Sequence, residues 1–435
     1  MLSLLLLSGI ALEIAALLVL SSKVSRGPKF LFTILSLYWF LSFIMRPLIF
    51  IYSRDNGVDS AVYDYRIGAN EKSFNEILFS IFFGCLIFSI SIFLLSIRPR
   101  MTQYRQVKIV QDAEYLSLIY ICFVFGYASI LLEGTALRNP FSKSLTLLVS
   151  TIFSAYLWKR SELGFSRKKD FSILLLGAVG TYVLSVSADR SKGVILLPLL
   201  VFLSSLRVWK RGRSGTLRLL LASLVALISI QLFSILQTYK LGGVSVSATN
   251  RNVEALPWFL SPFLVLVNRF DQFARVTDVY FASDNPMGSY RSWFNYLLSY
   301  LQWNPGQGRT TISFGQEWNK LVTNQSILGS RFSNVSLAQG MIGEGLVWSG
   351  FVSLILECTA IAVIFIWIGK LLDRGPLSVV FAFGLISNAA VFEMGLVQFS
   401  GIFSGSAKIL AFLWVAKKFS KFISHNNRRE PELEN

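Results

Sequence analysis

Long apolar runs separated by short polar and basic segments make up most of the sequence. A helix needs about 20 mainly apolar residues to cross a bilayer. On this criterion the pattern predicts membrane-spanning helices over residues 2–22, 30–52, 77–97, 115–133, 144–158, 171–188, 193–209, 216–237, 346–369, 376–397 and 399–416. The sequence therefore predicts an all-α polytopic membrane protein with about eleven transmembrane helices.

Lysine and arginine gather on one side of this layout. They concentrate in the short segments 23–29, 98–108, 159–169, 207–218 and 370–374, and in the tail 417–435. Because short cytoplasmic loops carry an excess of basic residues, these segments are predicted to be cytoplasmic and the N-terminus external. Topology then explains most of the formal net charge of +17, so we predict no nucleic-acid partner.

The layout divides the chain into four parts. They are an N-terminal bundle of eight helices over 1–237, an external loop over 238–345, three C-terminal helices over 346–416, and a basic cytoplasmic tail over 417–435. The external loop is the one extramembrane segment long enough to form a site of its own, so we predict the substrate site there. Its apolar run 256–267 and its aromatic run 293–303 are either re-entrant or interfacial elements, or a pair of further crossings.

Composition limits the chemistry that the protein can perform. Hydrophobic residues make up 53% of the chain and charged residues only 15%, whereas about 25% is usual for soluble domains. A cytosolic enzyme is thereby excluded. The single histidine, His425, lies in the tail, and the three cysteines lie in apolar runs without paired spacing. We therefore predict no metal, no cofactor and no histidine-based catalysis.

The predicted external face is rich in groups that bind anions. The turn 187–193 between two spans contains Asp189, Arg190 and Lys192. Arginine forks match phosphate oxygens in a bidentate way. The candidate anion-binding residues are Arg190, Lys192, Arg269, Arg275, Arg291, Arg309 and Arg331. The alternative for the turn is an ordinary interfacial segment whose cations contact lipid headgroups.

The segment 268–281 predicts an amphipathic helix in the external loop. Apolar and small residues recur at helical spacing, at Phe270, Phe273, Ala274, Thr277 and Phe281. The opposite face carries Asp271, Arg275 and Asp278. Their spacing predicts a structural ladder of ion pairs, and the alternative is a general base held beside an arginine.

Carboxylates on the external side are the candidate bases, namely Asp271, Asp278, Glu317 and Glu344. Glu344 is predicted at the mouth of the span 346–369, and a solvated loop acid is the alternative for it and for Glu317. Ionisable groups inside spans are costly and point to function; they are Arg46, Glu357, Glu393 and Lys408. We predict that Arg46 extends to the external face and that Glu393 pairs with Lys408. A continuous helix would place Glu357 about 20 Å below Glu344.

This layout resembles the bacterial O-antigen, capsule and exopolysaccharide polymerases of the Wzy type. The resemblance is carried by the Asp189-Arg190-Ser191-Lys192-Gly193 turn before an apolar run, and by one long external loop between late spans. O-antigen ligases and the SEDS peptidoglycan polymerases share the general fold, which is similar to that of GT-C glycosyltransferases.

The resemblance implies a metal-independent inverting glycosyltransferase in the bacterial cytoplasmic (inner) membrane. Such an enzyme transfers a growing glycan from undecaprenyl pyrophosphate onto the next lipid-linked repeat unit at the external face. Donor and acceptor lipids, membrane lipid and a chain-length regulator are the partners that it implies. Arg190 matches best as a pyrophosphate contact, whereas the other arginines match only as loop residues.

Two departures and two alternatives remain. O-antigen ligases carry a functional histidine in the long external loop; its absence here favours a polymerase over a ligase. Some polymerases place a glycine eleven residues after an external arginine, and no external arginine here has that spacing. A flippase or other transporter of lipid-linked oligosaccharides is the competing class, favoured by Glu357, Glu393 and Lys408. A scaffold without chemistry would leave the external arginines unexplained.

Overall fold

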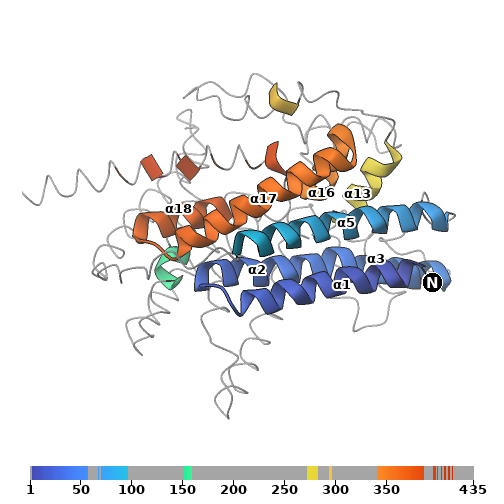
Figure 1. The fold of residues 1–435 in the computed structure, drawn as a ribbon, viewed down its shortest axis with the longest axis horizontal. Coiled ribbons are helices and arrows are strands. Elements are labelled where there is room, and N and C mark those ends of the chain that lie inside the picture. The colour runs from blue at the N-terminus through green and yellow to red at the C-terminus, as the bar shows by residue number, and fades with distance from the viewer. Residues whose placement is uncertain are drawn as a thin grey trace, which may run out of the picture.

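The computed structural model describes residues 2–56, 67, 70–96, 151, 153–158, 272–282, 293–295, 340–386, 395–397, 399, 403, 406–407, 410–411 and 414. These parts of the chain are almost entirely helical (Figure 1). Among the described residues, four helical segments are long and apolar enough to cross a membrane, namely Leu2–Ser21, Arg26–Asp55, Glu71–Ser96 and Phe351–Leu372. By helix length and hydropathy the chain is a multi-pass membrane protein, which confirms the predicted all-α membrane class.

The described helices agree with the predicted spans at 2–22 and 30–52 and differ from them at 346–369, where the segment is divided into two helices. The described helices are α1 (Leu2–Ser21), α2 (Arg26–Trp39), the π-helix η1 (Phe40–Met45), α3 (Arg46–Asp55), α5 (Glu71–Ser96), α13 (Gln272–Phe281), α16 (Gly340–Ser349), α17 (Phe351–Leu372) and α18 (Pro376–Ile386). The predicted spans 115–133, 171–188, 193–209 and 216–237 lie outside the described residues.

Helix α5 begins at Glu71, before the apolar run that predicted its start at residue 77. Asn70 explains the difference, because its side-chain oxygen accepts hydrogen bonds from the backbone N–H groups of Lys72 (3.1 Å) and Ser73 (3.3 Å). An asparagine in this position satisfies the free amides of a first helical turn. The polar residues before the apolar run are therefore helical rather than part of a loop.

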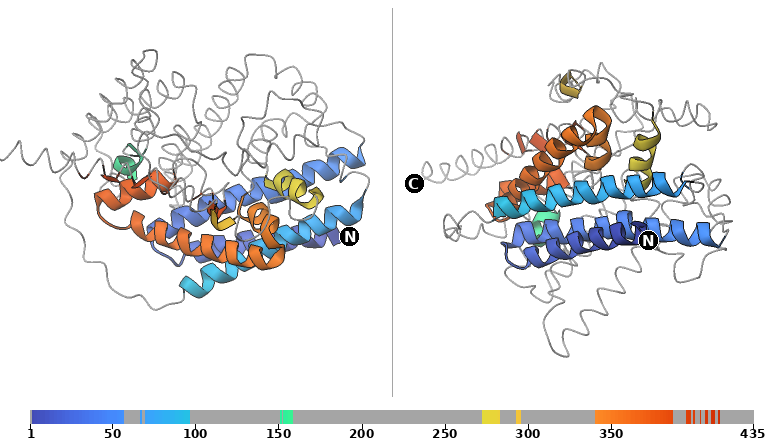
Figure 2. Two further views of the ribbon diagram at one scale, coloured as in Figure 1. Left: turned by 90° about the horizontal axis from the view of Figure 1, so that it is seen from above. Right: turned by 45° about the vertical axis from the view of Figure 1, so that its right-hand side comes forward.

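The long helices lie side by side, and this arrangement holds in every view (Figures 1 and 2). Helix α1 packs against α5 and α2, and α17 packs against α5 and α2. Aromatic rings join the layers, since Phe88 of α5 lies 5.4 Å from Trp39 of α2 and 5.6 Å from Phe365 of α17, ring centre to ring centre. These edge-to-face contacts form part of one continuous apolar core.

Helices α2 and α17 approach each other most closely at two glycines. A Cβ placed on Gly369 would lie 2.7 Å from Cγ and 2.8 Å from Cα of Pro28, and one placed on Gly27 would lie 2.9 Å from Cβ of Leu372. Small residues permit this close backbone approach between membrane helices. The crossing therefore depends on the absence of side chains at both positions.

We expect Gly369→Ala to destabilise the protein, because the added methyl group has no space at the crossing. Overpacking of this kind costs about 1–3 kcal/mol. Gly375→Ala is the matched control, since a Cβ there would meet nothing within 4 Å. Thermal unfolding of both purified variants in detergent measures the difference, and equal unfolding temperatures would contradict the close crossing.

One end of the bundle joins three segments that are distant in sequence. The Arg26 guanidinium lies 3.8 Å above the ring of Trp158 and donates a hydrogen bond to its carbonyl oxygen at 3.1 Å. The Trp158 indole N–H donates to the carbonyl of Leu372 at 3.0 Å, and the Gly27 N–H donates to Asp373 at 2.9 Å. The start of α2, residues 153–158 and the end of α17 therefore share one end, as the distribution of basic residues predicted.

The second span contains a widened turn before Pro47. The proline ring would clash with the carbonyl group of Phe43 in a regular α-helix, and the π-helix η1 occupies this position, with the Arg46 N–H bonded to the carbonyl of Leu41. A π-helical turn relieves such a clash. The prediction that Arg46 extends to the external face is wrong, because its side chain is packed inside the protein with an exposed fraction of 5%.

Candidate functional site

At the opposite end of the bundle, α13 packs onto α5 and η1. The ring of Phe273 contacts Phe74 of α5 at 5.9 Å, and Phe74 stacks on Phe50 of α3 at 5.2 Å. All three rings are buried. Helix α13 also contacts α16, and Figure 1 shows it at the end of the bundle where α5 begins. The predicted amphipathic helix is confirmed over Gln272–Phe281.

Two of the candidate site residues form an ion pair on α13. The Arg275 guanidinium donates to the Asp278 carboxylate, with 3.3 Å between Nη1 and Oδ2. This confirms the described part of the predicted ladder, whereas Asp271 lies outside the described residues. Asp278 is buried together with Phe273, although it was predicted on the face opposite the apolar residues. Its ion pair with Arg275 offsets part of the cost of burying a carboxylate.

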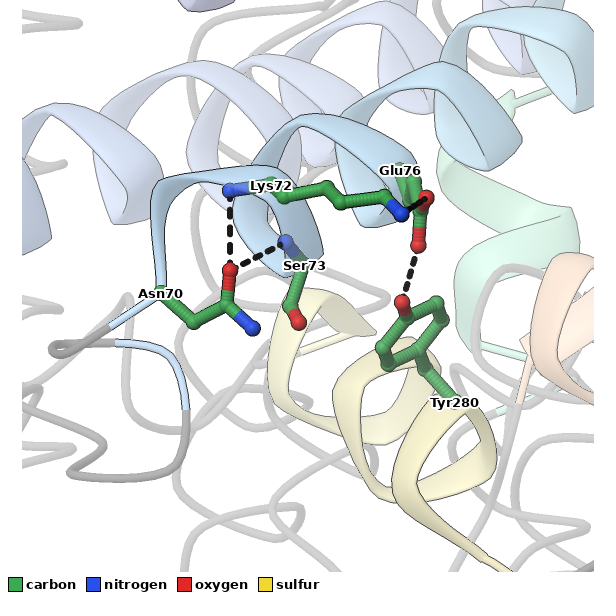
Figure 3. Close-up of polar contacts among 5 residues, drawn as sticks. All are labelled: Asn70, Lys72, Ser73, Glu76 and Tyr280. Carbon is green, nitrogen blue, oxygen red and sulfur yellow. Dashed lines mark hydrogen bonds and ion pairs between the residues drawn. The ribbon is translucent and has the colours of Figure 1, made fainter.

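A second polar contact joins α13 to the first turns of α5 (Figure 3). The Tyr280 hydroxyl donates a hydrogen bond to the Glu76 carboxylate, and Lys72 Nζ lies 3.9 Å from the other oxygen of Glu76. This hydrogen bond raises the pKa of the Tyr280 phenol above its ordinary value of 10.0, because ionisation would place two negative charges together. Sequence reasoning missed this contact, although Glu76 directly precedes an apolar run.

A groove of about 910 Å³ lies between α1, α5, α13 and the junction of α16 with α17. Its walls are mainly apolar and are formed by Leu2, Leu6, Phe79, Val276, Val279, Leu346 and Phe351. Its polar rim is formed by Glu71, Lys72, Asn75, Glu76 and Tyr280. Apolar walls with a few converging polar groups are typical of small-molecule sites. The groove therefore suits a ligand with an apolar chain and a polar head.

We expect Tyr280→Phe to loosen α13 from α5, seen as faster hydrogen exchange of residues 272–282 at neutral pH. Because the pKa of Tyr280 is raised in the folded state, its contribution is present at neutral pH and is lost as the pH rises through that raised value. Tyr52→Phe is the matched control, since Tyr52 lies near the same end of the bundle and is exposed to the same extent, 38% against 37% for Tyr280. Equal exchange in both variants would contradict the role of the hydroxyl.

The segment predicted as one span over 346–369 is broken at Gly350. Gly350 has φ +62, a conformation that favours glycine, and it separates α16 from α17. The two helices pack together beyond the break, where Ser353 Oγ donates to the carbonyl of Gly345. A Cβ on Gly345 would lie 2.8 Å from Leu354 Cα and 3.3 Å from Glu357 Cβ.

This packing brings Glu344 and Glu357 together, so the predicted separation of about 20 Å along one helix is wrong. Their carboxyl groups accept hydrogen bonds from neighbouring backbone N–H groups. The Val397 N–H donates to Glu344 at 2.7 Å, and the Leu396 N–H donates to Glu357. These amides begin a helical turn in which the Gly395 carbonyl accepts from the Phe399 N–H at 3.0 Å. We call Glu344 and Glu357 the carboxyl pair.

Glu344 is fully buried and Glu357 is 4% exposed. The alternative of a solvated loop acid is therefore wrong for Glu344. Its role as a base stays a prediction, and a substrate would reach its carboxyl group only after the surrounding helices had moved. Glu357, for which the sequence suggested no partner, has the Leu396 amide as its partner.

The remaining candidates lie outside the described residues. They are Arg190, Lys192, Arg269, Asp271, Arg291, Arg309, Glu317 and Arg331, together with Glu393, Lys408 and the apolar run 256–267. Within the described parts of the chain, the structure brings Arg275 and Asp278 together and assigns Glu344 to the separate carboxyl pair.

Comparison with known proteins gives no relative from which a function could be transferred. No protein-family model, curated protein or solved structure matches the chain. The groove, the ion pair on α13 and the sequence pattern are therefore the features that indicate a function.

Proposed function

We propose that the protein is a membrane glycosyltransferase that polymerises undecaprenyl-pyrophosphate-linked oligosaccharide repeat units at the external face of the bacterial cytoplasmic membrane. The groove is the observation that carries this proposal. Its apolar walls belong largely to helices long enough to cross a membrane, and its polar rim lies beside α13. An isoprenoid chain suits the walls, and sugar hydroxyls suit the carboxylate, amide and phenol groups of the rim.

The proposed orientation places α13 and the groove outside and the Arg26 end of the bundle in the cytoplasm. The positive-inside rule supports it, because Lys23, Arg26, Lys29, Lys370 and Arg374 belong to the segments at the Arg26 end. The layout of about eleven spans predicted from the sequence resembles that of the Wzy-type polymerases and other GT-C-like enzymes, and this resemblance supports the proposal. A polymerase in this orientation would meet its lipid-linked substrates where the cell assembles its envelope glycans.

The proposed reaction needs a base and positive charge but no metal. The acceptor hydroxyl attacks the anomeric carbon of the donor, forming the new glycosidic bond. The bond from that carbon to the pyrophosphate oxygen breaks, and its electron pair leaves with the pyrophosphate. The hydroxyl proton passes to a carboxylate, for which Asp278 is our first candidate.

We propose that Arg275 contacts both the Asp278 carboxylate and the pyrophosphate of the donor. A guanidinium stabilises the charge that develops on a pyrophosphate leaving group. When phosphate oxygens replace Asp278 as its partner, the carboxylate becomes available to accept a proton. Arg190 and Lys192 remain proposed pyrophosphate contacts with Arg269, Arg291, Arg309 and Arg331, and Asp271, Glu317 and Glu344 remain alternative bases.

Glycan length in cells tests the proposal. A strain lacking the gene is complemented with the wild type or with Arg190→Ala, and equal amounts of protein in the membrane are verified. We expect the deletion to leave single capped repeat units, the wild type to restore a ladder, and Arg190→Ala to fail. An unchanged ladder in the deletion strain would contradict the polymerase.

A transporter of lipid-linked oligosaccharides is the second candidate, and the carboxyl pair favours it. Transporters place ionisable groups at interrupted helices inside the membrane, and the carboxyl pair contacts a helix start near the break at Gly350. Loss of all surface glycan in the deletion strain, single units included, would favour a flippase or a ligase instead of a polymerase.

A further inference from the structure

The carboxyl pair lies in the interior of the protein, and neither of its acids lines the groove. Among the described residues, the pair lies between α16 with Glu344, α17 with Glu357, and the helical turn that begins at Gly395. A Cβ on Gly395 would lie 2.6 Å from Cβ of Glu344 and would overlap its carboxyl group. The site is therefore shaped around the two acids.

Among the described residues, no cation near the pair balances two negative charges. The titratable groups near it, among the described residues, are the thiols of Cys358 on α17 and Cys85 on α5, with Glu13 of α1 close to Cys85. None of these groups supplies a positive charge. The two amides at the helix start supply a partial positive charge, which suits one carboxylate. Two adjacent buried carboxylates would repel each other and would both lose hydration.

One oxygen of the pair is buried and has no hydrogen-bond partner in the part of the chain that the structure describes. Oε1 of Glu344 accepts from the Val397 amide, whereas Oε2 accepts from none of the described residues and has no contact with solvent. Burying a polar atom in this way is unfavourable unless a ligand occupies the position or the group is neutral. The buried Oε2 atom of Glu344 and the proximity of the two acids are independent observations. Both indicate that a positively charged ligand, such as a proton, is bound at the pair.

We propose that Glu344 and Glu357 bind one proton between them at neutral pH. The pair then carries a single negative charge, which the amides of Leu396 and Val397 stabilise. Two carboxyl groups that interact strongly titrate as a unit rather than separately. Loss of the proton would place two negative charges in the same space and separate α16 from the helix start at Gly395. This site is a proton-dependent contact, and it does not depend on Asp278 acting as the base in the proposed transfer.

Infrared spectroscopy of the purified full-length protein in lipid tests the proposal. A neutral carboxyl group has a C=O absorption that is distinct from that of a carboxylate and that shifts in D₂O. We expect such a band at pH 7, and we expect the double variant Glu344→Gln/Glu357→Gln to lose it. Glutamine keeps an oxygen that can accept from the amides at 396 and 397. Asp55→Asn is the control, because Asp55 is exposed and should not contribute to the band.

Two results would overturn the proposal. The first is a wild-type protein without a neutral carboxyl band at pH 7, which would be decisive however the variants fold. The second is a combination of two observations. The neutral carboxyl band persists in the double variant, and sodium or potassium raises the unfolding temperature of the wild type but not of the variant. The ligand of the pair would then be a monovalent cation. Glycan synthesis does not enter either measurement, so failure here would leave the proposed function standing.

Discussion

Replacing Arg275 with alanine is expected to reduce the yield of long glycan by about 100-fold, the usual effect of removing one group that stabilises developing negative charge. The variant loses the cation beside Asp278, which we propose as the base. It also removes one interaction of a carboxylate of low exposure. The yield is measured by densitometry of the glycan ladder from cells with equal amounts of protein in the membrane.

Three further variants separate chemistry from structure at this position. Arg54→Ala removes another cation near the groove end, which pairs with Asp55 at 2.9 Å, and it should leave the ladder unchanged. Arg275→Lys keeps the charge but loses the fork, so an intermediate yield is expected. The double variant Arg275→Ala/Asp278→Ala removes the carboxylate as well as the cation. If it restored the ladder, the ion pair would be structural and its proposed role in transfer would be wrong.

Gly395→Ala is expected to have the largest effect on stability, because its Cβ would overlap the carboxyl group of Glu344 in a fully buried position. We expect a loss of about 3 kcal/mol, at the upper end for overpacking. Gly384→Ala is the control, since its nearest neighbour would be Ser406 Oγ at 3.2 Å, the end of a side chain that can rotate. Thermal unfolding in detergent compares the two variants.

A double-mutant cycle makes this prediction specific to the carboxyl pair. Glu344→Ala removes the group that the new methyl would meet, so Gly395→Ala should cost much less in that background. An equal loss of stability in both backgrounds would show that the methyl group clashes elsewhere. It would also contradict the close contact between Gly395 and Glu344.

The sequence predicts the membrane helices well because a span requires little more than a long apolar run. Helices α1 and α5 and the continuous segment from α2 to α3 follow such runs. Helix α13 was also predictable, because Phe273 and Phe281 belong to a clear helical period. The start of α5 was displaced because hydropathy detects apolar residues and gives no weight to the capping oxygen of Asn70.

Features that depend on tertiary packing were not predictable. Residues 346–369 form an apolar run, and the break at Gly350 adds no polar signal to it. Glu344 and Glu357 therefore seemed distant although α16 and α17 bring them together. Arg46 was predicted to reach the surface from its position in the second span beside Pro47. The sequence near Arg46 gives no information about the helices that cover its side chain. The groove joins Leu2 to Val276, and no local pattern relates residues so far apart.

The most direct test of the central claim uses the purified protein with lipid-linked repeat units in detergent and a metal chelator. A polymerase should convert the units into a ladder of longer glycans and release one polyprenyl pyrophosphate for each bond formed. Arg275→Ala should release almost none, whereas Arg54→Ala should match the wild type. Repeat units that remain intact with the folded wild-type protein would contradict the glycosyltransferase. Repeat units that cross the bilayer of a proteoliposome unchanged would indicate a transporter instead.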